Sequence, residues 1–223
     1  MKRNYLWSGL ALGALTLAVW GCATEGPTAP GSSQGPSLAR ATTVTGYISP
    51  SDPALLAWYN SEKARVAAAA LTEAPVYDSL VASMPPGNSW VNQATKNGVA
   101  QCYPQQYAAD VQIIGPDGGE LTVGKHSFSV PPKALSKYYV ITAEAHAQSQ
   151  VGLQFSPEGL GFAKAALVKL SYAMCAFPDG TTKSVVYTDD RWNIKEYEPT
   201  ADDVLNKILG GNIVHFSQYA VAW

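Results

Sequence analysis

From Val111 to the end of the chain, short runs of alternating apolar and polar residues are separated by turn-forming residues. Such alternation places apolar side chains on one face of an extended segment, which is typical of a half-buried β-strand. The runs read, in chain order, VQIIG, GELTV, HSFSV, YYVITAEAH, VGLQF, ALVKLSYAM, KSVVYT and RWNIKEY. Helix-sized segments do not alternate with them, so a parallel α/β sheet is disfavoured. The pattern predicts a mainly β chain folded as an antiparallel β-sandwich.

The last part of the chain carries two reactive side chains close together. The segment TADDVLNKIL predicts a short helix or a turn, and the alternation resumes from Ile213 to Trp223 as a terminal strand. In that strand His215 and Ser217 share the more aromatic face, on either side of Phe216. This stretch is therefore the main candidate for chemistry.

Residues 51–110 precede the strand-rich region and differ from it in composition. Ser51 or Asp52 can cap a helix that has Pro53 at its first position, where the missing N–H costs nothing. The following residues are good helix formers, and Pro75 predicts the end of this helix or the start of a second short one. The apolar side chains expected to dock the helix onto the following domain are Leu55, Trp58, Tyr59 and Val66.

The N-terminus has the pattern of an export signal. Lys2 and Arg3 precede an apolar run of 14 residues, which is shorter than the roughly 20 residues of a membrane-spanning helix. The run ends at Trp20-Gly21-Cys22 and resembles the lipobox of bacterial lipoproteins, in which the signal peptide, here residues 1–21, is removed and the cysteine is lipidated. An ordinary secretory signal cut near Ala23 and an uncleaved anchor are the alternatives.

Residues 22–50 would then comprise the lipidated Cys22 and a flexible linker, because the first half is mainly Gly, Pro, Ser and Thr. Acyl chains such as palmitate on Cys22 would anchor the protein stably to a membrane. Ala23 after the cysteine is similar to lipoproteins that are sent to the outer membrane. We therefore expect a lipid-anchored protein of the bacterial cell envelope, at the outer membrane, with the membrane itself as one partner.

The mature chain is mildly acidic. Removal of the signal peptide takes two of the 15 Lys and Arg residues and none of the 17 Asp and Glu residues, so the formal charge is 13 − 17 = −4. Surfaces that bind nucleic acids carry clustered Lys and Arg, and the sequence has no such cluster. We expect no nucleic-acid partner and no cofactor.

Two cysteines, Cys102 and Cys175, remain beside Cys22. In an exported protein an even remainder predicts a disulfide, which stabilises a fold with so long a loop by about 4 kcal/mol on the chain-entropy model. Two buried free thiols are the alternative. Neither cysteine has a CxxC partner or a neighbouring His, so a metal site is disfavoured.

Four segments in the strand-rich region share their order and spacing with a known module. IIGPDGGELTV, FSVPPKAL, LQFSPEGLGFAKAALVKLSY and VHFSQYAVAW together resemble the ZU-five domain of zonula occludens proteins, Unc-five netrin receptors and ankyrins, which also occurs in bacterial exported proteins. The resemblance covers residues 111–223 and implies a β-sandwich. Residues 162–165 depart from the family, in which a proline is commoner after the basic residue.

The resemblance also implies a chemistry for the terminal strand, because several members of this fold family cut themselves between Phe and Ser of an HFS sequence. Ser217 would attack the carbonyl of Phe216, and His215 would accept the hydroxyl proton. In an ideal strand the side chains of His215 and Ser217 lie about 7 Å apart, so the attack needs a kink. The alternative is that His215 and Ser217 are ordinary strand residues.

The remaining His, Asp and Glu residues give weaker indications of a catalytic or metal site. A hydrolase acting on other molecules would need a carboxylate beside His215, and the sequence has no GxSxG nucleophile elbow between a strand and a helix. The candidate carboxylates are Asp189, Asp190 and Glu196. His126 and His146 are expected to be surface or hydrogen-bonded residues, and the pairs 189–190 and 202–203 lack the spacing of a calcium loop. We expect no metal.

These observations predict a membrane-anchored envelope lipoprotein that displays a β-sandwich for binding or structure, with an envelope protein or a cell-wall polymer as partner. Self-processing at His215, Phe216 and Ser217 is one alternative. A polysaccharide-binding module is another, since exposed aromatic rings supply apolar area with a polar edge. The candidate rings are Trp58, Trp90, Trp192, Tyr138 and Tyr139.

Overall fold

The computed structural model describes residues 44–84, 93–94 and 98–223, and residues 41–223 form one compact unit. The helix of the described residues is α1 (Pro53–Ala82). The strands are β1 (Gln93–Ala94), β2 (Ala100–Gln105), β3 (Ala108–Ile114), β4 (Gly119–Val123), β5 (His126–Val130), β6 (Tyr139–Ala145), β7 (Gln148–Gln150), β8 (Gly152–Ser156), β9 (Gly161–Ser171), β10 (Ser184–Thr188), β11 (Ile194–Tyr197), β12 (Thr200–Asp203), β13 (Ile208–His215) and β14 (Gln218–Ala222).

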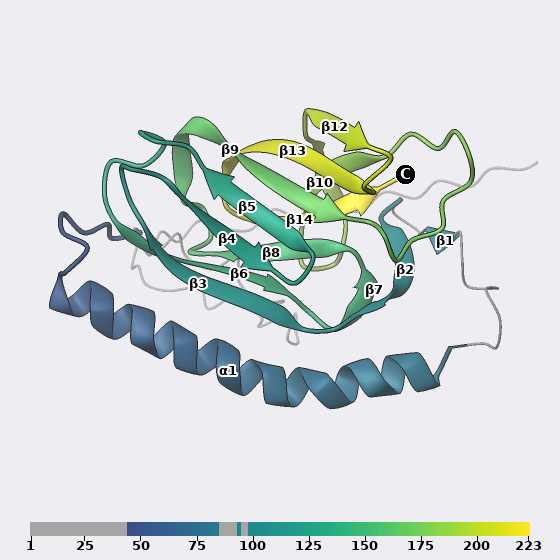
Figure 1. Ribbon diagram of the computed structural model, residues 1–223, viewed down its shortest axis with the longest axis horizontal. Helices are drawn as coiled ribbons and strands as arrows, with labels where there is room; N and C mark the ends of the chain where they lie inside the picture. The colour runs from purple at the N-terminus through teal and green to yellow at the C-terminus, as the bar shows by residue number, and fades with distance from the viewer. Residues whose placement is uncertain (1–43, 85–92, 95–97) are drawn as a thin grey trace, which may run out of the picture. The chain divides into compact units, whose positions relative to one another are not determined.

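Two antiparallel sheets form the body of the protein (Figure 1). One has six strands in the order β11-β10-β14-β8-β6-β3, and the other has five in the order β12-β13-β9-β5-β4. A small third sheet, β1-β2-β7, lies at one end of the sandwich. The prediction of a mainly β chain with an antiparallel sandwich is therefore confirmed.

The core lies between the two large sheets and is built by the alternation read from the sequence. In β6 the side chains of Ile141, Ala143 and Ala145 point inward, and in β9 those of Val168 and Leu170 meet them from the opposite sheet. All five belong to one buried apolar cluster. Because alternate residues of β6 and β8 point away from this core, Glu144 and Gln154 lie on the outer face of the six-stranded sheet.

Helix α1 begins as predicted but continues further. The side chain of Asp52 accepts hydrogen bonds from the backbone N–H groups of Ala54 and Leu55, at 2.8 and 3.4 Å. The predicted break at Pro75 is wrong, because α1 runs through it to Ala82. Pro75 is exposed, so water can solvate the carbonyl group that loses its helical partner.

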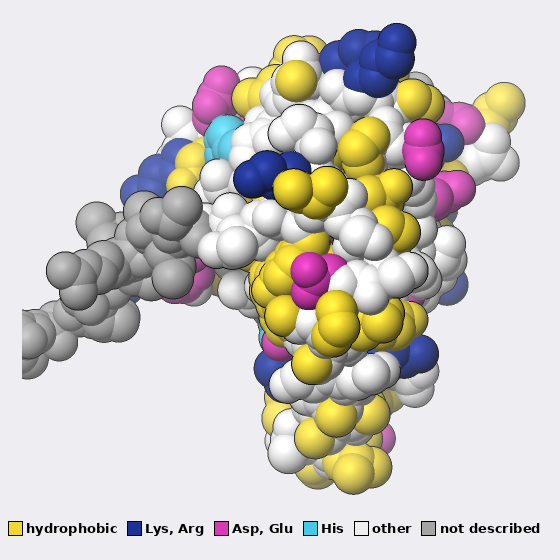
Figure 2. Space-filling view, turned by 90° about the vertical axis from the view of Figure 1, so that its left-hand side faces the viewer, with side chains coloured by type: hydrophobic (Ala, Val, Ile, Leu, Met, Phe, Trp, Pro, Cys, Tyr) yellow, Lys and Arg dark blue, Asp and Glu magenta, His cyan; other side chains and the backbone are white. Residues whose placement is uncertain are grey.

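The helix docks on the outer face of the six-stranded sheet, along β3 and β6 (Figure 1). Leu55 is fully buried against Val111 and Val140. Around these three pack the partly buried side chains of Tyr47, Trp58, Tyr59, Val66, Ile113 and Tyr138. Seen from the end of the molecule where α1 begins, hydrophobic side chains gather between the helix and the sandwich (Figure 2). The predicted docking face of the helix is therefore confirmed.

The predicted single terminal strand from Ile213 to Trp223 is wrong. The chain leaves the five-stranded sheet at His215, the last residue of β13, and enters the six-stranded sheet at Gln218, the first residue of β14. Phe216 and Ser217 form the crossover between the sheets. A sandwich corner breaks the period of two without changing the sequence pattern around it, so the alternation alone did not reveal the break.

The segment TADDVLNKIL also differs from its prediction in part. Its first residues form the edge strand β12, which pairs with the start of β13. The predicted turn occupies residues 204–207, and Asp203 accepts hydrogen bonds there from the backbone and side chain of Asn206. An edge strand tolerates acidic residues that a central strand would exclude.

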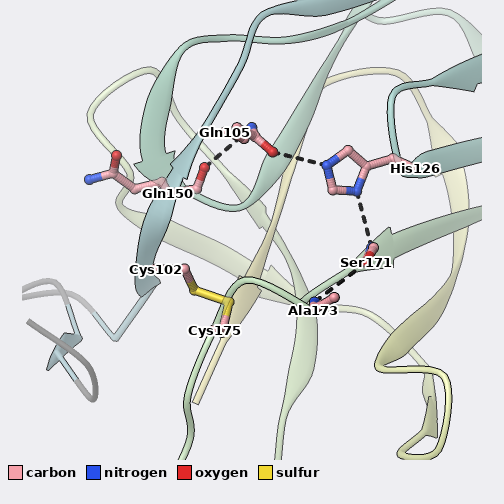
Figure 3. The surroundings of a disulfide bond; sticks show 7 residues. All are labelled: Cys102, Gln105, His126, Gln150, Ser171, Ala173 and Cys175. Atoms are coloured by element: carbon pink, nitrogen blue, oxygen red, sulfur yellow. Dashed lines mark hydrogen bonds between the residues drawn. A yellow bond between two sulfur atoms is a disulfide. The ribbon is translucent and has the colours of Figure 1, made fainter. Parts of the chain in front are cut away.

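Cys102 and Cys175 form a disulfide, as predicted, that joins β2 to the loop after β9. Beside it the buried imidazole of His126 lies between Gln105 and Ser171 (Figure 3). Nδ1 of His126 accepts from the Ser171 N–H at 3.0 Å, so Nε2 carries the proton and donates to Oε1 of Gln105 at 2.9 Å. Burial, with a smaller contribution from the charge of Lys125, lowers the pKa of His126 to about 4.

Candidate functional site

The crossover from β13 to β14 brings the predicted site residues into one turn, but on different elements. His215 ends β13 and is partly exposed, whereas Phe216 and Ser217 are buried. The ring of Phe216 stacks on that of Phe155, with centroids 5.0 Å apart, and lies 5.3 Å from that of Phe128. This aromatic packing fixes the position of the Phe216 backbone.

Hydrogen bonds hold the peptide group on either side of the Phe216–Ser217 bond. The carbonyl of Phe216 accepts a hydrogen bond from the N–H of Gly159 at 3.1 Å. The N–H of Phe216 donates to the carbonyl of Leu160 at 2.8 Å. The Ser217 carbonyl accepts from the N–H of Phe155 at 3.1 Å. A donor is therefore directed at the carbonyl oxygen on which negative charge would develop if Ser217 attacked Phe216.

The predicted base, His215, faces aromatic neighbours. Its Nδ1 lies 3.3 Å from the hydroxyl of Tyr219, which also donates to the His215 carbonyl at 2.7 Å. The rings of Tyr187 and His215 meet edge to face at 5.2 Å. Within the described part of the chain, no hydrogen bond joins the side chains of His215 and Ser217. Burial, followed by the charge of Glu198, raises the pKa of Tyr219, so its hydroxyl stays protonated.

Of the acidic candidates, Asp189 is occupied within its own turn. Asp189 accepts hydrogen bonds from the backbone of Arg191 and from Asn193, and it pairs with Lys195 at 2.8 Å. The hydrogen bonds from Lys195 and Asn193 hold its pKa well below the ordinary value. Asp190 is exposed and lines a hollow on the outer face of the six-stranded sheet. Asp189 is therefore part of the β10–β11 turn rather than a partner of His215.

The second acidic pair is likewise engaged. Asp202 pairs with Lys183 at 3.0 Å and accepts from the hydroxyl of Tyr172 at 2.7 Å. Among residues 44–84, 93–94 and 98–223, no group of three or more His, Cys, Asp and Glu side chains could hold a metal ion.

A second concentration of polar side chains lies on the outer face of the six-stranded sheet, under α1. Glu144 in β6 accepts from Arg65 of the helix and from the hydroxyl of Tyr107. Burial alone would raise the pKa of Glu144, and the bonds from Arg65 and Tyr107 outweigh it, so the pKa lies below the ordinary value. Next to it, His146 lies 3.0 Å from Oε1 of Glu73 and 3.1 Å from Oε1 of Gln154.

Two of the predicted aromatic residues border this polar surface and two do not. Trp58 of α1 and Trp192 of the β10–β11 turn line adjoining hollows. Tyr138 packs in the apolar cluster under the start of α1, and Tyr139 packs against the main core. Trp90 lies outside the described residues, as does Cys22.

Sequence reasoning missed the glutamines and Glu144 that form this surface. Gln154 and Gln218 occupy polar positions of strands that were identified by their apolar residues. The available signal was the composition of the polar positions, where uncharged amides stand in place of the Lys and Glu that usually face solvent. Neighbouring strands had to be known before these positions could be seen as one surface.

Neither a scan against protein-family models nor a search of curated proteins found a match to this chain. The likeness to the ZU-five domain therefore stays a prediction from the sequence. No helix in the described ranges, α1 included, has the length and apolar character needed to cross a membrane.

Proposed function

We propose that the protein is a bacterial envelope lipoprotein, anchored through lipidated Cys22, whose β-sandwich is a binding module for another envelope component. The observation that carries this proposal is the disulfide between Cys102 and Cys175 inside the compact unit. Disulfides of this kind persist in oxidising compartments, which agrees with an export signal ahead of the folded unit. In this proposal residues 22–50 comprise the lipidated cysteine and a flexible linker.

The partner in this proposal is an envelope protein or a cell-wall polymer. Its support is the polar surface beside α1, where Glu144, His146 and Gln154 lie between two tryptophans on a rigid sheet. A surface built on strands and a packed helix holds its side chains in fixed positions, which suits recognition.

Anchoring is tested by expressing the full-length protein and its Cys22→Ser variant in a Gram-negative host that is fed a palmitate analogue. The wild-type protein is expected to take up the label and to sediment with outer membranes. The Cys22→Ser variant is expected to take up no label. Labelling of the variant, or an unlabelled wild-type protein, would refute the anchor. A variant with both Cys102→Ser and Cys175→Ser is the control, because it should still be labelled.

We propose self-processing as a second candidate function, because the Gly159 N–H is directed at the Phe216 carbonyl oxygen. Oγ of Ser217 would attack the carbonyl carbon of Phe216 while His215 accepts the hydroxyl proton. The C–N bond would then break, the proton would pass to the Ser217 nitrogen, and an ester would join Phe216 to Ser217. Water would hydrolyse the ester to a Phe216 carboxylate and a Ser217 hydroxyl.

Denatured intact mass tests this second function. Cleavage would separate residues 217–223, which remain paired in β14 between β8 and β10 under native conditions. The wild-type chain is expected to lose this seven-residue peptide on denaturation, and Ser217→Ala is expected to keep it. Slower cleavage in His215→Ala than in the wild type would support the role of His215 as the base. Equal, unbroken masses for the wild type and Ser217→Ala would exclude cleavage.

A further inference from the structure

A groove crosses the outer face of the six-stranded sheet between α1 and the β10–β11 turn. It consists of two adjoining hollows that share Glu144, His146 and Gln154. The hollow beneath α1 has a volume of about 410 Å³ and is bordered by Trp58. The hollow toward the turn has a volume of about 250 Å³ and is bordered by Trp192.

A row of polar residues that are direct neighbours runs across four strands, and its first three members line the floor of the groove. Glu144 of β6 lies opposite Gln154 of β8, Gln154 lies opposite Gln218 of β14, and Gln218 lies opposite Thr188 of β10. Adjacent strands lie about 4.8 Å apart, so the three residues that line the floor span about 10 Å. That length suits a short chain molecule lying across the strands.

Glu144, at one end of this row, is fixed by protein contacts, whereas Gln218 of the row and Gln148 of β7 offer free hydrogen-bonding groups to the same hollow. Glu144 is held by Arg65 and Tyr107. Among the described residues, the side-chain amides of Gln148 and Gln218 have no hydrogen-bond partner. These two amides are partly exposed where they line the hollow, so a ligand can replace the water that solvates them.

The walls of the groove are two indole rings on opposite sides. Trp192 has φ = 62°, a left-handed conformation that bulky residues rarely adopt. It packs on the buried cluster of Val99, Val186, Ala220 and Ala222. Asp189 fixes the turn by accepting from the backbone N–H groups of Arg191 and Asn193. The turn therefore holds a flat apolar ring beside the free amides.

The charges around the groove disfavour an anionic ligand. Three carboxylates line the groove, those of Glu62, Glu144 and Asp190, and Glu73 contacts His146 beside it. Among the Lys and Arg residues of the described chain, Arg65 alone lines the two hollows. Amide groups both donate and accept hydrogen bonds, as do the hydroxyl groups of a sugar. Indole faces supply apolar area for the C–H faces of a pyranose ring.

We propose that this groove binds an uncharged oligosaccharide chain, stacked on Trp192 and hydrogen-bonded to Gln148 and Gln218. The inference rests on the proposed function and names the ligand class of the displayed module. It places the cell-wall polymer, rather than an envelope protein, as the partner of this face.

Isothermal titration of detergent-solubilised full-length protein tests the proposal. The probes are hexasaccharides of β-1,4-linked glucose, N-acetylglucosamine, mannose and xylose, and of α-1,4-linked glucose, with hexagalacturonate as the charged counterpart. At least one neutral probe is expected to bind with one-to-one stoichiometry. Trp192→Ala is expected to weaken that binding at least tenfold, and Gln218→Leu at least threefold. Tyr197→Ala, an exposed ring that does not line the groove, is expected to bind as the wild type does.

Melting temperatures of the variants show whether a loss of binding reflects unfolding. If Trp192→Ala unfolds, Trp58→Ala and Gln148→Leu take its place. The proposal is overturned if no neutral probe binds, if hexagalacturonate binds as tightly as the best neutral probe, or if folded groove variants bind unchanged. Because this assay needs no membrane attachment, its failure is distinguishable from a failure of anchoring at Cys22.

Discussion

The guanidinium group of Arg65 in α1 binds both carboxylate oxygens of Glu144 in β6, at 2.6 and 3.2 Å, across 79 residues of sequence. The side chain of Glu144 is only 9% exposed, and that of Arg65 is 45% exposed. The hydroxyl of Tyr107 donates a further bond to Glu144 at 2.6 Å. The helix therefore supplies most of the charge that compensates a buried carboxylate of the sheet.

Replacing Arg65 by Met should destabilise the protein by about 2 kcal/mol, because the Glu144 carboxylate keeps its burial and loses its cation. The free energy of unfolding from urea titration measures this change. Lys195→Ala is the matched control, since Lys195 pairs with Asp189 on a more exposed surface and should cost less than about 1 kcal/mol. Similar losses in the two variants would contradict the importance of burial.

Acid should destabilise the protein through His126. The unfolded chain takes up a proton on this imidazole near its ordinary pKa of 6.5, whereas the folded chain does so only near 4. The stability contributed by the neutral ring is therefore fully present above pH 6.5 and is lost as the pH falls toward 4. The loss amounts to about 3 kcal/mol at most.

The measurement is the free energy of unfolding of the wild type and of His126→Gln at several pH values from 7 to 4. The wild type should lose more stability over this range than the variant, whose amide does not titrate. Parallel curves would show that His126 does not account for the acid sensitivity. Carboxylates such as Glu144 titrate in both proteins and cancel in the comparison.

Loss of the disulfide should lower stability by about 4 kcal/mol, because Cys102 and Cys175 close a loop across 73 residues. For a domain of this size the melting temperature should fall by about 10 °C. Calorimetry of the protein with both Cys102→Ser and Cys175→Ser checks this value. A reductant should shift the wild type in the same direction and leave the double variant unchanged.

The sequence predicted those features that depend on local pattern. The helix start followed from a cap at Ser51 or Asp52, of which the structure uses Asp52, and from Pro53 at the first helical position. Strand β5 was read correctly because Phe128 and Val130 alternate with serines and stop at a proline pair. The pairing of Cys102 with Cys175 followed from the oxidising compartment of an exported protein and from the even number of remaining cysteines, not from their positions in the sequence.

Features that depend on contacts between segments distant in the sequence were missed. The crossover at Phe216 and Ser217 requires that Leu160 and Gly159 approach it from another connection, and no local signal marks that approach. Helix α1 continues through Pro75 because this residue faces solvent. Which side of the helix faces solvent is decided by how α1 packs on the sheet. The polar groove depends on the register of four strands, and register is a tertiary property.

The turn between β3 and β4 depends on glycine at position 118. Gly118 has φ = 78° and its N–H donates to the carbonyl of Gly115 at 3.0 Å. A Cβ atom there would overlap the carbonyl oxygen of Val130 and crowd the following proline pair. Gly180 has nearly the same φ, 76°, but no atom within 4 Å of a Cβ. The two glycines therefore separate conformational strain from steric overlap.

Gly180→Ala should destabilise the protein by about 1 kcal/mol, the cost of placing alanine in a left-handed conformation. Gly118→Ala should cost at least about 2 kcal/mol more, because the Val130 carbonyl is part of the pairing of β4 with β5 and has little room to move. Urea titration of both variants under one condition measures the difference. Equal losses would mean that the β3–β4 turn relaxes around the added methyl group and that φ alone sets the requirement for glycine at position 118.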